Sequence, residues 1–332
     1  MQYRKLGRTD LVISEVGFGC GNTAGLMVRG SHEEQLNAVR RALDLGINDF
    51  DTAQSYGDGK SETNLGRVLK ELDAKPCVAT KVRVGADALS DIKAHALASV
   101  EQSLQRLQRN SIDLIQLHTR VVVKREEGRF GITPGEILGA NGVLEAFKVL
   151  RDRGKVRFFG FSALGDPAAT RMLIDSGEFD AIQVYYNLLN PSAGYTVPPD
   201  FSALNYERII DRAVAQEMGI VVVRVLAGGA LTSTPDAGGA RGSVPLSPGS
   251  DYELDVVRAR SLSFLIGDEI RSLSQAAIRF ALTKSEISTV LVGFSTLGQI
   301  EEAVACSAAG GLSENLLSRL ETRWDSDFGN PS

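Results

Sequence analysis

The sequence predicts an α/β protein of the (β/α)8, or TIM-barrel, class, with an N-terminal β-hairpin and long loops at the C-terminal face of the barrel. Three observations carry this prediction: short runs rich in β-branched and aromatic residues, amphipathic segments between them, and glycines where a helix is followed by a strand. Strands that alternate with helices and are apolar along their length form a parallel sheet buried on both faces. Eight such units indicate a closed barrel rather than an open sheet.

The expected strands are short apolar runs that precede polar residues or glycine. These segments are Val16–Phe18, Asp49–Asp51, Val78–Lys81, Ile112–Leu117, Val156–Phe161, Ala181–Val184, Ile220–Val225 and Thr289–Val292. Between them, apolar residues recur three and four positions apart, as they do on one face of a helix. The expected helices are Glu33–Leu45, Glu62–Leu72, Ile92–Leu107, Val143–Arg153, Ala168–Ser176, Tyr206–Gln216, Ser274–Leu282 and Gln299–Ser307. Glycines such as Gly46 and Gly154 follow these helices, as is typical of a helix C-cap.

Segments outside this alternation lie at the N-terminus and in three longer stretches. Tyr3–Leu6 and Leu11–Ser14 flank a Gly-Arg-Thr-Asp turn and predict a β-hairpin that plugs the bottom of the barrel. The longer stretches are Thr119–Asn141, Gly228–Gly267 and Gly310–Ser332. The first two follow strand C-terminal ends, where barrel loops shape the active-site pocket, although a disordered insertion is an alternative for the second. We expect residues 1–332 to form one barrel domain, because a barrel uses about 250 residues and often carries such loops.

The composition narrows the function classes. The 36 basic and 41 acidic residues give a net charge of −5, which disfavours nucleic acid and anionic membranes as main partners. Apolar residues make up 43% of the chain and charged residues 23%, as in globular proteins with a large core. The three cysteines are widely spaced and form no CxxC motif, so neither a disulfide framework nor a metal site is expected.

The cellular compartment is also predicted from absent signals. The first ten residues are polar and charged, unlike a signal peptide. The apolar runs are far shorter than the roughly 20 residues that span a bilayer. We therefore expect a cytoplasmic protein that does not bind membranes; the sequence leaves its oligomeric state open.

Two familiar motifs are present but are not expected to function. The segment from Gly19 to Ala24 fits G-x-G-x-x-A, yet the following residues, Gly25 to Gly30, do not open the amphipathic helix of a Rossmann nucleotide site. Tyr56 and Lys60 fit Y-x-x-x-K, in which both side chains share one helix face. Glycines between them make a helix improbable, so we reject that pairing.

Four chemically distinct side chains follow expected strands. Asp51 ends the second strand, Tyr56 lies in the glycine-rich loop after it, Lys81 ends the third strand and His118 follows the fourth. Each alone has an ordinary structural role, such as capping a helix or packing in the core. A barrel brings all strand C-terminal ends to one face, so together they predict one pocket with an acid, a phenol, an ammonium and an imidazole.

These residues carry a resemblance to the aldo-keto reductase family, which extends over nearly the whole chain, most closely to its sugar and aldehyde dehydrogenase-like members. The matching segments are FDTAQSYGDGKSETNLG, VATKVR, SIDLIQLH, GKVRFFGFS, AIQVYYNLLN and VLVGFSTLGQIEEAV. The first is highly specific, because it combines Asp51, Tyr56 and the Ser61-Glu62 helix start. The resemblance implies a (β/α)8 barrel, a nicotinamide cofactor, and the catalytic residues Asp51, Tyr56, Lys81 and His118.

The implied reaction interconverts a carbonyl (aldehyde, ketone or sugar lactone) and the corresponding alcohol by hydride transfer. Negative charge grows on the carbonyl oxygen and must be met by a proton. Tyr56 is the expected general acid, or base in reverse. We expect Lys81 to lower the pKa of the phenol from its usual value near 10, with Asp51 holding Lys81 charged and His118 orienting the carbonyl.

The resemblance also implies where the cofactor binds. The expected cofactor residues are Gly19, Cys20, Gly21, Ser162, Gln183, Arg224, Leu226, Gly228, Gly293, Ser295, Gln299 and Glu302. Val223 or Arg224 stands where many members have an aromatic residue on the nicotinamide ring. Where NADPH-preferring members place Lys or Arg, this chain has neutral residues such as Ser295 and Gln299. NADP(H) or NAD(H) therefore both stay open.

Two alternatives use the same barrel differently. One is a Schiff-base aldolase with Lys81 as nucleophile. The other is a regulatory subunit that keeps the fold and cofactor without turnover. The substrate itself, and the direction of the reaction, are not identified by the sequence.

Overall fold

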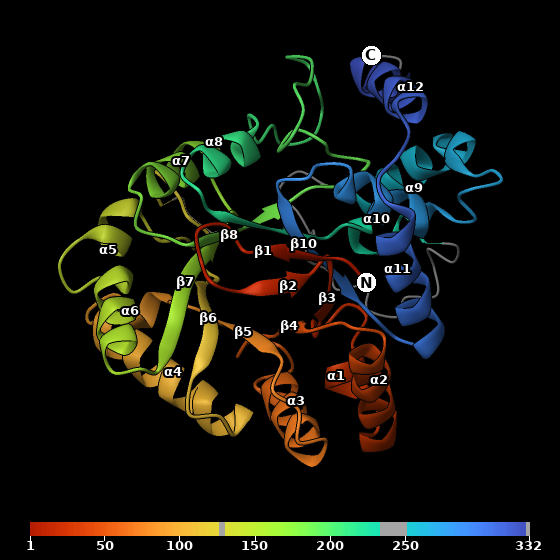
Figure 1. Ribbon diagram of the computed structural model, residues 1–332. Coiled ribbons are helices and arrows are strands. Elements are labelled where there is room, and N and C mark those ends of the chain that lie inside the picture. Colours follow the sequence, from red (N-terminus) through yellow and green to blue (C-terminus); the bar gives the residue numbers. More distant parts are fainter. Residues whose placement is uncertain (126–129, 233–250, 330–332) are drawn as a thin grey trace.

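A computed structural model describes residues 1–125, 130–232 and 251–329. Its centre is a closed barrel of eight parallel strands in the order β10-β3-β4-β5-β6-β7-β8-β9 (Figure 1). The strands are β3 (Val16–Gly19), β4 (Asp49–Asp51), β5 (Cys77–Val82), β6 (Ile112–Leu117), β7 (Val156–Ser162), β8 (Ala181–Tyr185), β9 (Gly219–Val223) and β10 (Ile287–Gly293). The predicted (β/α)8 barrel is confirmed.

Helices surround the barrel (Figure 1), and those of the repeating strand–helix units bury an apolar stripe against the outer faces of the strands. The helices are α1 (Leu26–Arg29), α2 (His32–Asp44), α3 (Lys60–Glu71), α4 (Ile92–Leu107), α5 (Pro134–Leu138), α6 (Val143–Asp152), α7 (Pro167–Asp175), α8 (Ile209–Ala215), α9 (Tyr252–Ser261), α10 (Leu273–Leu282), α11 (Leu297–Ala309) and α12 (Glu314–Asp325). Single 3-10 turns lie at Ala86–Ala88, Ala227–Gly229, Ser263–Leu265 and Asp327–Gly329. Local sequence fixes where some helices begin. For example, Ser31 and Glu34 form a capping box at the N-terminus of α2.

An antiparallel hairpin of β1 (Tyr3–Lys5) and β2 (Val12–Ser14) lies across the barrel, as predicted (Figure 1). Leu6 and Ile13 pack into a second apolar cluster with inward-facing barrel residues such as Leu114. Arg4 joins the hairpin to the start of β10, since its Nη1 donates to the carbonyls of Lys284 (2.9 Å) and Ile287 (2.7 Å). The hairpin therefore closes the end of the barrel opposite the strand C-termini.

Several sequence expectations need correction. Residues 119–141, expected as a loop, contain α5, and residues 251–265 of the second long stretch form α9 and a 3-10 turn; its residues 233–250 lie outside the described residues. The tail contains α12, whose Trp324 is buried and donates from Nε1 to the carbonyl of Leu188 (2.9 Å). A single helical turn, α1, follows the Gly19–Ala24 segment. Strand β9 ends at Val223, before Arg224 turns left-handed (φ 57°).

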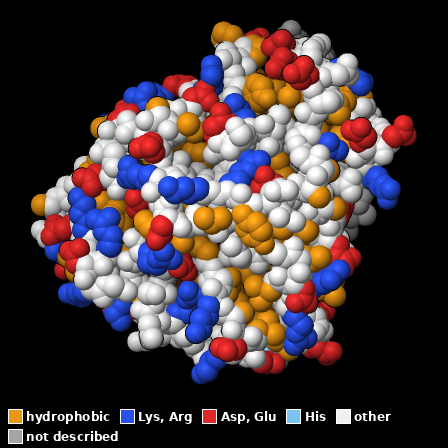
Figure 2. All heavy atoms as spheres, in the orientation of Figure 1, with side chains coloured by type: hydrophobic (Ala, Val, Ile, Leu, Met, Phe, Trp, Pro, Cys, Tyr) orange, Lys and Arg blue, Asp and Glu red, His pale blue; other side chains and the backbone are white. Residues whose placement is uncertain are grey.

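The surface carries acidic and basic side chains interspersed, in keeping with the small net charge; Figure 2 shows this on the hairpin face. Among the described residues, none of the helices has the length and apolar character needed to cross a membrane. The same residues contain no cluster of His, Cys, Asp and Glu able to hold a metal ion.

Candidate active site

The site begins with a buried ion pair between neighbouring strands. Asp51 ends β4 and Lys81 is the fifth residue of β5, and the Lys81 side chain is only 1% exposed. Lys81 Nζ donates to Asp51 Oδ1, to the carbonyl of Thr52 (2.8 Å) and to the Tyr56 hydroxyl (3.5 Å). A buried ammonium is tolerated only with such partners, so these bonds hold its charge beside the phenol.

Tyr56 is held by the turn between β4 and α3. Its N–H donates to the carbonyl of Ala53 (3.0 Å), and left-handed Gly57 and Gly59 then lead into α3, which begins at Lys60. The helix therefore starts after Tyr56, and the phenol contacts Lys81 rather than Lys60. The rejected Y-x-x-x-K pairing is thus absent for a structural reason.

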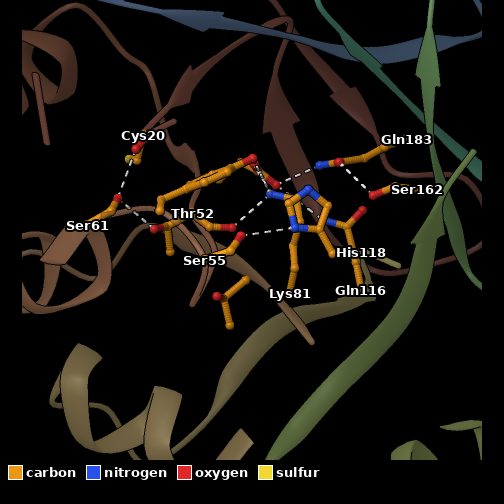
Figure 3. Close-up of polar contacts among 12 residues, drawn as sticks. Cys20, Thr52, Ser55, Ser61, Lys81, Gln116, His118, Ser162 and Gln183 are labelled. Carbon is orange, nitrogen blue, oxygen red and sulfur yellow. Dashed lines mark hydrogen bonds and ion pairs between the residues drawn. The ribbon is translucent and has the colours of Figure 1, made fainter. Parts of the chain in front are cut away.

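Ser61 and Glu62, the two residues that follow Lys60, anchor the turn that carries Tyr56. Ser61 Oγ donates to the carbonyl of Cys20 (2.9 Å) and lies 2.8 Å from Thr52 Oγ1, which ties the turn to the ends of β3 and β4 (Figure 3). Glu62 is fully buried and bonds to Thr80 and Arg106. The start of α3 is thereby fixed to the barrel.

His118 follows β6 and completes the group. The backbone N–H of His118 donates to the carbonyl of Val82 (2.8 Å). The His118 ring stands perpendicular to the Tyr56 ring, with centroids 5.7 Å apart. Ser55 Oγ lies 3.4 Å from Nδ1 (Figure 3). Burial, with the positive charge of Lys81 next, lowers the pKa of His118 to about 3, so the imidazole is neutral near pH 7.

The structure corrects one electrostatic expectation. Burial raises the pKa of Tyr56 above its ordinary value, and Lys81 lowers it only in part. Burial by itself lowers the pKa of Lys81, but the charges of Asp51 and Tyr56 outweigh it and leave that pKa raised. Both directions favour a protonated phenol and a charged lysine near neutral pH.

Three polar side chains inside the barrel extend the network. Gln183 Nε2 (2.7 Å) and Gln116 Nε2 (3.2 Å) both donate to Asp51 Oδ2, and Ser162 Oγ donates to Gln183 Oε1 (3.2 Å) (Figure 3). Ser162 and Gln183 were predicted to lie at the cofactor, whereas Gln116 was not among the predicted site residues. Gln116 could have been recognised in the sequence, because it is a single amide in the otherwise apolar end of the strand Ile112–Leu117. Every residue of that strand is buried.

The predicted cofactor residues of β3 and β10 meet at one edge of the barrel. Gly19 pairs with Gly293 at the ends of these strands, and a Cβ on Gly293 would lie 3.0 Å from the Ala24 Cβ. Gly21 lies close to the Tyr56 ring, since a Cβ there would lie 3.7 Å from Cζ. Cys20 is 1% exposed, and its side chain belongs to the core cluster.

The residues predicted for the adenosine end gather at the start of α11. Ser295 donates from its N–H to Gln299 Oε1 (2.7 Å) and from Oγ to the carbonyl of Ala24 (3.1 Å). Glu302, one turn further on, accepts from Ser272 Oγ of the α10 N-cap. Among the described residues beyond its own helix turn, none lies within 4 Å of a Cβ built on Gly298, at the start of α11.

The segment after β9 has an unusual backbone. Arg224 (φ 57°), Ala227 (φ 47°) and Gly228 (φ 68°) all turn left-handed, while Leu226 accepts the N–H of Gly229 (2.9 Å). Within the described part of the chain, the buried Nη1 of Arg224 has no hydrogen-bond partner. Burial lowers the pKa of this guanidinium. An unpaired buried donor is costly, which makes it available to an anion or acceptor that enters the pocket.

These features together define a class: a (β/α)8 barrel with a buried Lys–Asp pair touching a phenol, and a neutral imidazole beside it, at the C-terminal mouth. The chain belongs to the aldo/keto reductase family, whose model matches residues 15–324. It is 27% identical to L-galactose dehydrogenase of Arabidopsis thaliana, over 97% of this chain and 93% of that protein. It is 26% identical to L-glyceraldehyde 3-phosphate reductase of Escherichia coli (strain K12), over 92% and 87% of the two chains.

Other relatives bear different names. The chain is 28% identical, over 91% of its length and 87% of the relative's, to a putative voltage-gated potassium channel subunit beta of Schizosaccharomyces pombe. Among solved structures it is similar in fold to the holo form of the aldo-keto reductase AKR11C1 from Bacillus halodurans, with a TM-score of 0.73, 23% identity and coverage of 98% and 97%.

Proposed function

We propose that this aldo-keto reductase is an NAD(P)-dependent oxidoreductase that interconverts a carbonyl compound and its alcohol, with Tyr56 as general acid and base. One observation carries the proposal: the Tyr56 hydroxyl lies 3.5 Å from the buried Lys81 ammonium, and the neutral His118 ring stands beside it. Membership of the family supports the same class of reaction.

Tyr56 is suited to donate a proton in carbonyl reduction. Its raised pKa keeps the hydroxyl protonated, and Lys81 stabilises the phenolate that remains after the proton leaves. In alcohol oxidation the same phenolate accepts the hydroxyl proton. Asp51 acts through Lys81, because its carboxylate keeps that ammonium charged and in place.

His118 orients the substrate. A neutral imidazole donates one hydrogen bond without repelling Lys81, so the carbonyl oxygen is held between His118 and Tyr56 as negative charge develops on it. Ser55 lies within hydrogen-bond distance of Nδ1 and favours one ring orientation.

The residues present fit a nicotinamide cofactor, which supplies or accepts the hydride when bound. Ser162 and Gln183 offer amide and hydroxyl groups at the barrel mouth for a carboxamide. We propose that the cofactor lies against the backbone of Gly19, Cys20, Gly21, Leu226, Gly228 and Gly293, because glycine lets a backbone approach a ligand closely. Arg224 supplies a cation whose Nη1 is buried and lacks a bond within the residues described.

The adenosine end offers neutral partners. Ser295 and Gln299 bond each other at the start of α11, and Glu302 provides a carboxylate nearby. A 2′-phosphate is bound best by Arg or Lys, so we propose that NAD(H) competes effectively with NADP(H) at this site.

The relatives favour a polyhydroxy substrate. L-galactose dehydrogenase and L-glyceraldehyde 3-phosphate reductase are named for sugar-type compounds, so we propose a sugar aldehyde, lactol or related alcohol as substrate, acted on in the cytoplasm. We further propose that residues 1–332 function as one barrel domain.

The two alternatives are less well supported. An aldolase needs a neutral amine, whereas Lys81 Nζ makes three hydrogen bonds and its pKa is raised. A regulatory role, suggested by the channel-subunit relative, does not require the four side chains to converge, yet they do.

Titration of the protein with NADH and NADPH, followed by cofactor fluorescence, tests the proposal before any substrate is known. A panel of aldoses, aldehydes and sugar alcohols is then tested as substrates, with turnover measured by the change in nicotinamide absorbance. We expect binding of at least one cofactor and turnover of a polyhydroxy compound. Binding without turnover would favour the regulatory alternative, and borohydride trapping of Lys81 without cofactor binding would favour the aldolase.

A further inference from the structure

A second carboxyl group lies inside the barrel below the site. Asp49 begins β4 and Asp51 ends it, so the two side chains point to the same face, two residues apart. Both line a cavity inside the barrel together with Gln116 and Cys77 and apolar residues that include Ile13 of the hairpin. Asp49 is thus nearer the hairpin, and Asp51 nearer the catalytic side chains.

Asp49 lacks the partners that Asp51 has. Asp51 accepts from Lys81 and from two amides, whereas no Lys or Arg of the described ranges forms an ion pair with Asp49. Its neighbour on β5, by strand register, is Cys77, whose thiol hydrogen-bonds the carboxyl group. Room for the carboxyl comes from Gly17, because a Cβ there would lie 2.9 Å from Asp49 Oδ2. The barrel therefore encloses this acid without a counter-charge.

The surroundings suit a carboxylic acid that carries its proton. Gln116 Oε1 and Thr289 Oγ1 are buried and have no hydrogen-bond partner among the described residues. Thr289 Oγ1 lies on the Asp49 side, since it is 3.1 Å from the same Gly17 Cβ position. The cavity has room for about one water molecule. A protonated carboxyl donates a hydrogen bond; a carboxylate only accepts.

We propose that Asp49 is a positioning residue whose carboxyl group inside the barrel ionises as the pH rises, its proton passing to water, and that its charge acts on Tyr56 through Asp51 and Lys81. The inference rests on the proposed function of Tyr56. When Asp49 is neutral, Asp51 is the only one of the two carboxyl groups whose negative charge stabilises the Lys81 ammonium. When Asp49 is charged, a second negative charge holds the Lys81 proton more firmly and disfavours the Tyr56 phenolate.

The electrostatics agree with this geometry. Burial, followed by the negative charge of Asp51, raises the pKa of Asp49 to about 7. The ionisable groups that act on it are Asp51 on its own strand, Cys77 and Lys81 on β5, and Asp113 on β6. On the β3 and β10 sides its neighbours are Gly17 and Thr289, which do not ionise. A pKa of about 7 means that Asp49 loses its proton near neutral pH.

The size of the effect follows from the strand spacing. Two residues of strand separate Asp49 from Asp51 by about 7 Å, which places the Lys81–Tyr56 pair about 10 Å from the Asp49 carboxyl. At an effective dielectric constant near 20, one charge at that distance moves a pKa by about one unit. The coupling is large enough to measure.

The first test compares pH profiles of kcat/KM for alcohol oxidation in the wild-type enzyme and Asp49→Asn. We expect the limb that reports the Tyr56 phenolate to shift to lower pH by about one unit in the variant, because one negative charge is gone. The matched control is Asp10→Asn, which removes an exposed carboxylate (71% side-chain exposure) at the hairpin and leaves the profile unchanged. A variant profile that overlays the wild type overturns the coupling.

The second test needs no substrate. A buried acid whose pKa is raised in the folded protein destabilises the fold as pH rises from about 4 to about 7, since only the unfolded chain readily gives up that proton. Asp49→Asn lacks this penalty, so its Tm relative to wild type rises between pH 5 and pH 8. A difference in Tm that is constant with pH overturns the proposal, even if no substrate is found.

If Asp49→Asn does not fold, infrared spectroscopy of the wild-type chain decides. We expect a buried protonated-carboxyl band at pH 5.5 that is lost by pH 8.5, and a spectrum without that change overturns the proposal. Failure of wild-type turnover with every cofactor contradicts the proposed function, but leaves the stability and infrared results to judge Asp49.

Discussion

Replacing Lys81 with methionine removes the ammonium that contacts Tyr56 while keeping a side chain of similar length. The two groups are 3.5 Å apart, so at an effective dielectric constant near 20 their charges interact by about 4.7 kcal/mol. That energy corresponds to about 3.5 pH units, an upper limit because Asp51 partly offsets the positive charge. We expect the pKa of Tyr56 to rise by about two to three units in Lys81→Met.

The assay is the pH dependence of kcat/KM for alcohol oxidation, in which the phenolate is the base. The rising limb moves to higher pH by the same two to three units, and the rate at pH 8 falls by a factor of about 100 to 1000. Cofactor affinity, measured by fluorescence, stays within a few-fold. Lys60→Met serves as the control, because Lys60 is exposed at the start of α3 and does not contact the phenol.

A Lys81→Met enzyme whose limb coincides with that of the wild type would refute the reasoning. The variant must also be shown to fold, since Asp51 loses its cation, and removing one partner of a buried ion pair costs about 3–5 kcal/mol. Circular dichroism and the unfolding midpoint provide that check. Uptake of a proton by Asp51 reduces this cost at low pH.

Three further predictions follow from other contacts. Tyr56→Phe lowers turnover at least about 100-fold while NAD(P)H still binds, and near-normal turnover would contradict its role as general acid. Glu62→Ala lowers the free energy of unfolding by about 3–5 kcal/mol in urea titrations, because Arg106 loses its partner and Thr80 its acceptor inside the fold; a change under 1 kcal/mol would contradict this. Trp324→Ala costs about 3–5 kcal/mol, seen as a lower Tm by circular dichroism, and an unchanged Tm would show that α12 contributes little.

The alternation of strands and helices was predictable because it depends on local rules. Eight apolar runs and the amphipathic segments between them correspond to the observed strands and to the helices that cover them. The hairpin was predictable for the same reason. The added helices α5, α9 and α12 were missed, since each lies in a stretch between or beyond the regular units, where no repeating pattern demanded a helix.

The site was predictable in its members but not in its electrostatics. Asp51, Lys81 and His118 lie at strand ends, and a barrel must bring strand ends together. Their pKa values depend on how much water each loses and on which charges surround it in three dimensions. Lys81 lowers the pKa of Tyr56, as expected, but burial raises that pKa more, so the net shift is upward.

By itself, the sequence determined the barrel, the family and the four side chains expected to carry the chemistry, because periodicity and strand-end position are local properties. Only the tertiary structure decided that Gln116 joins the network, that Arg224 adopts a left-handed turn with its Nη1 buried, and that Asp49 lines a cavity without an ion-pair partner among the described residues. These properties depend on which strands become neighbours and on the space between them, and no local pattern in the chain records that.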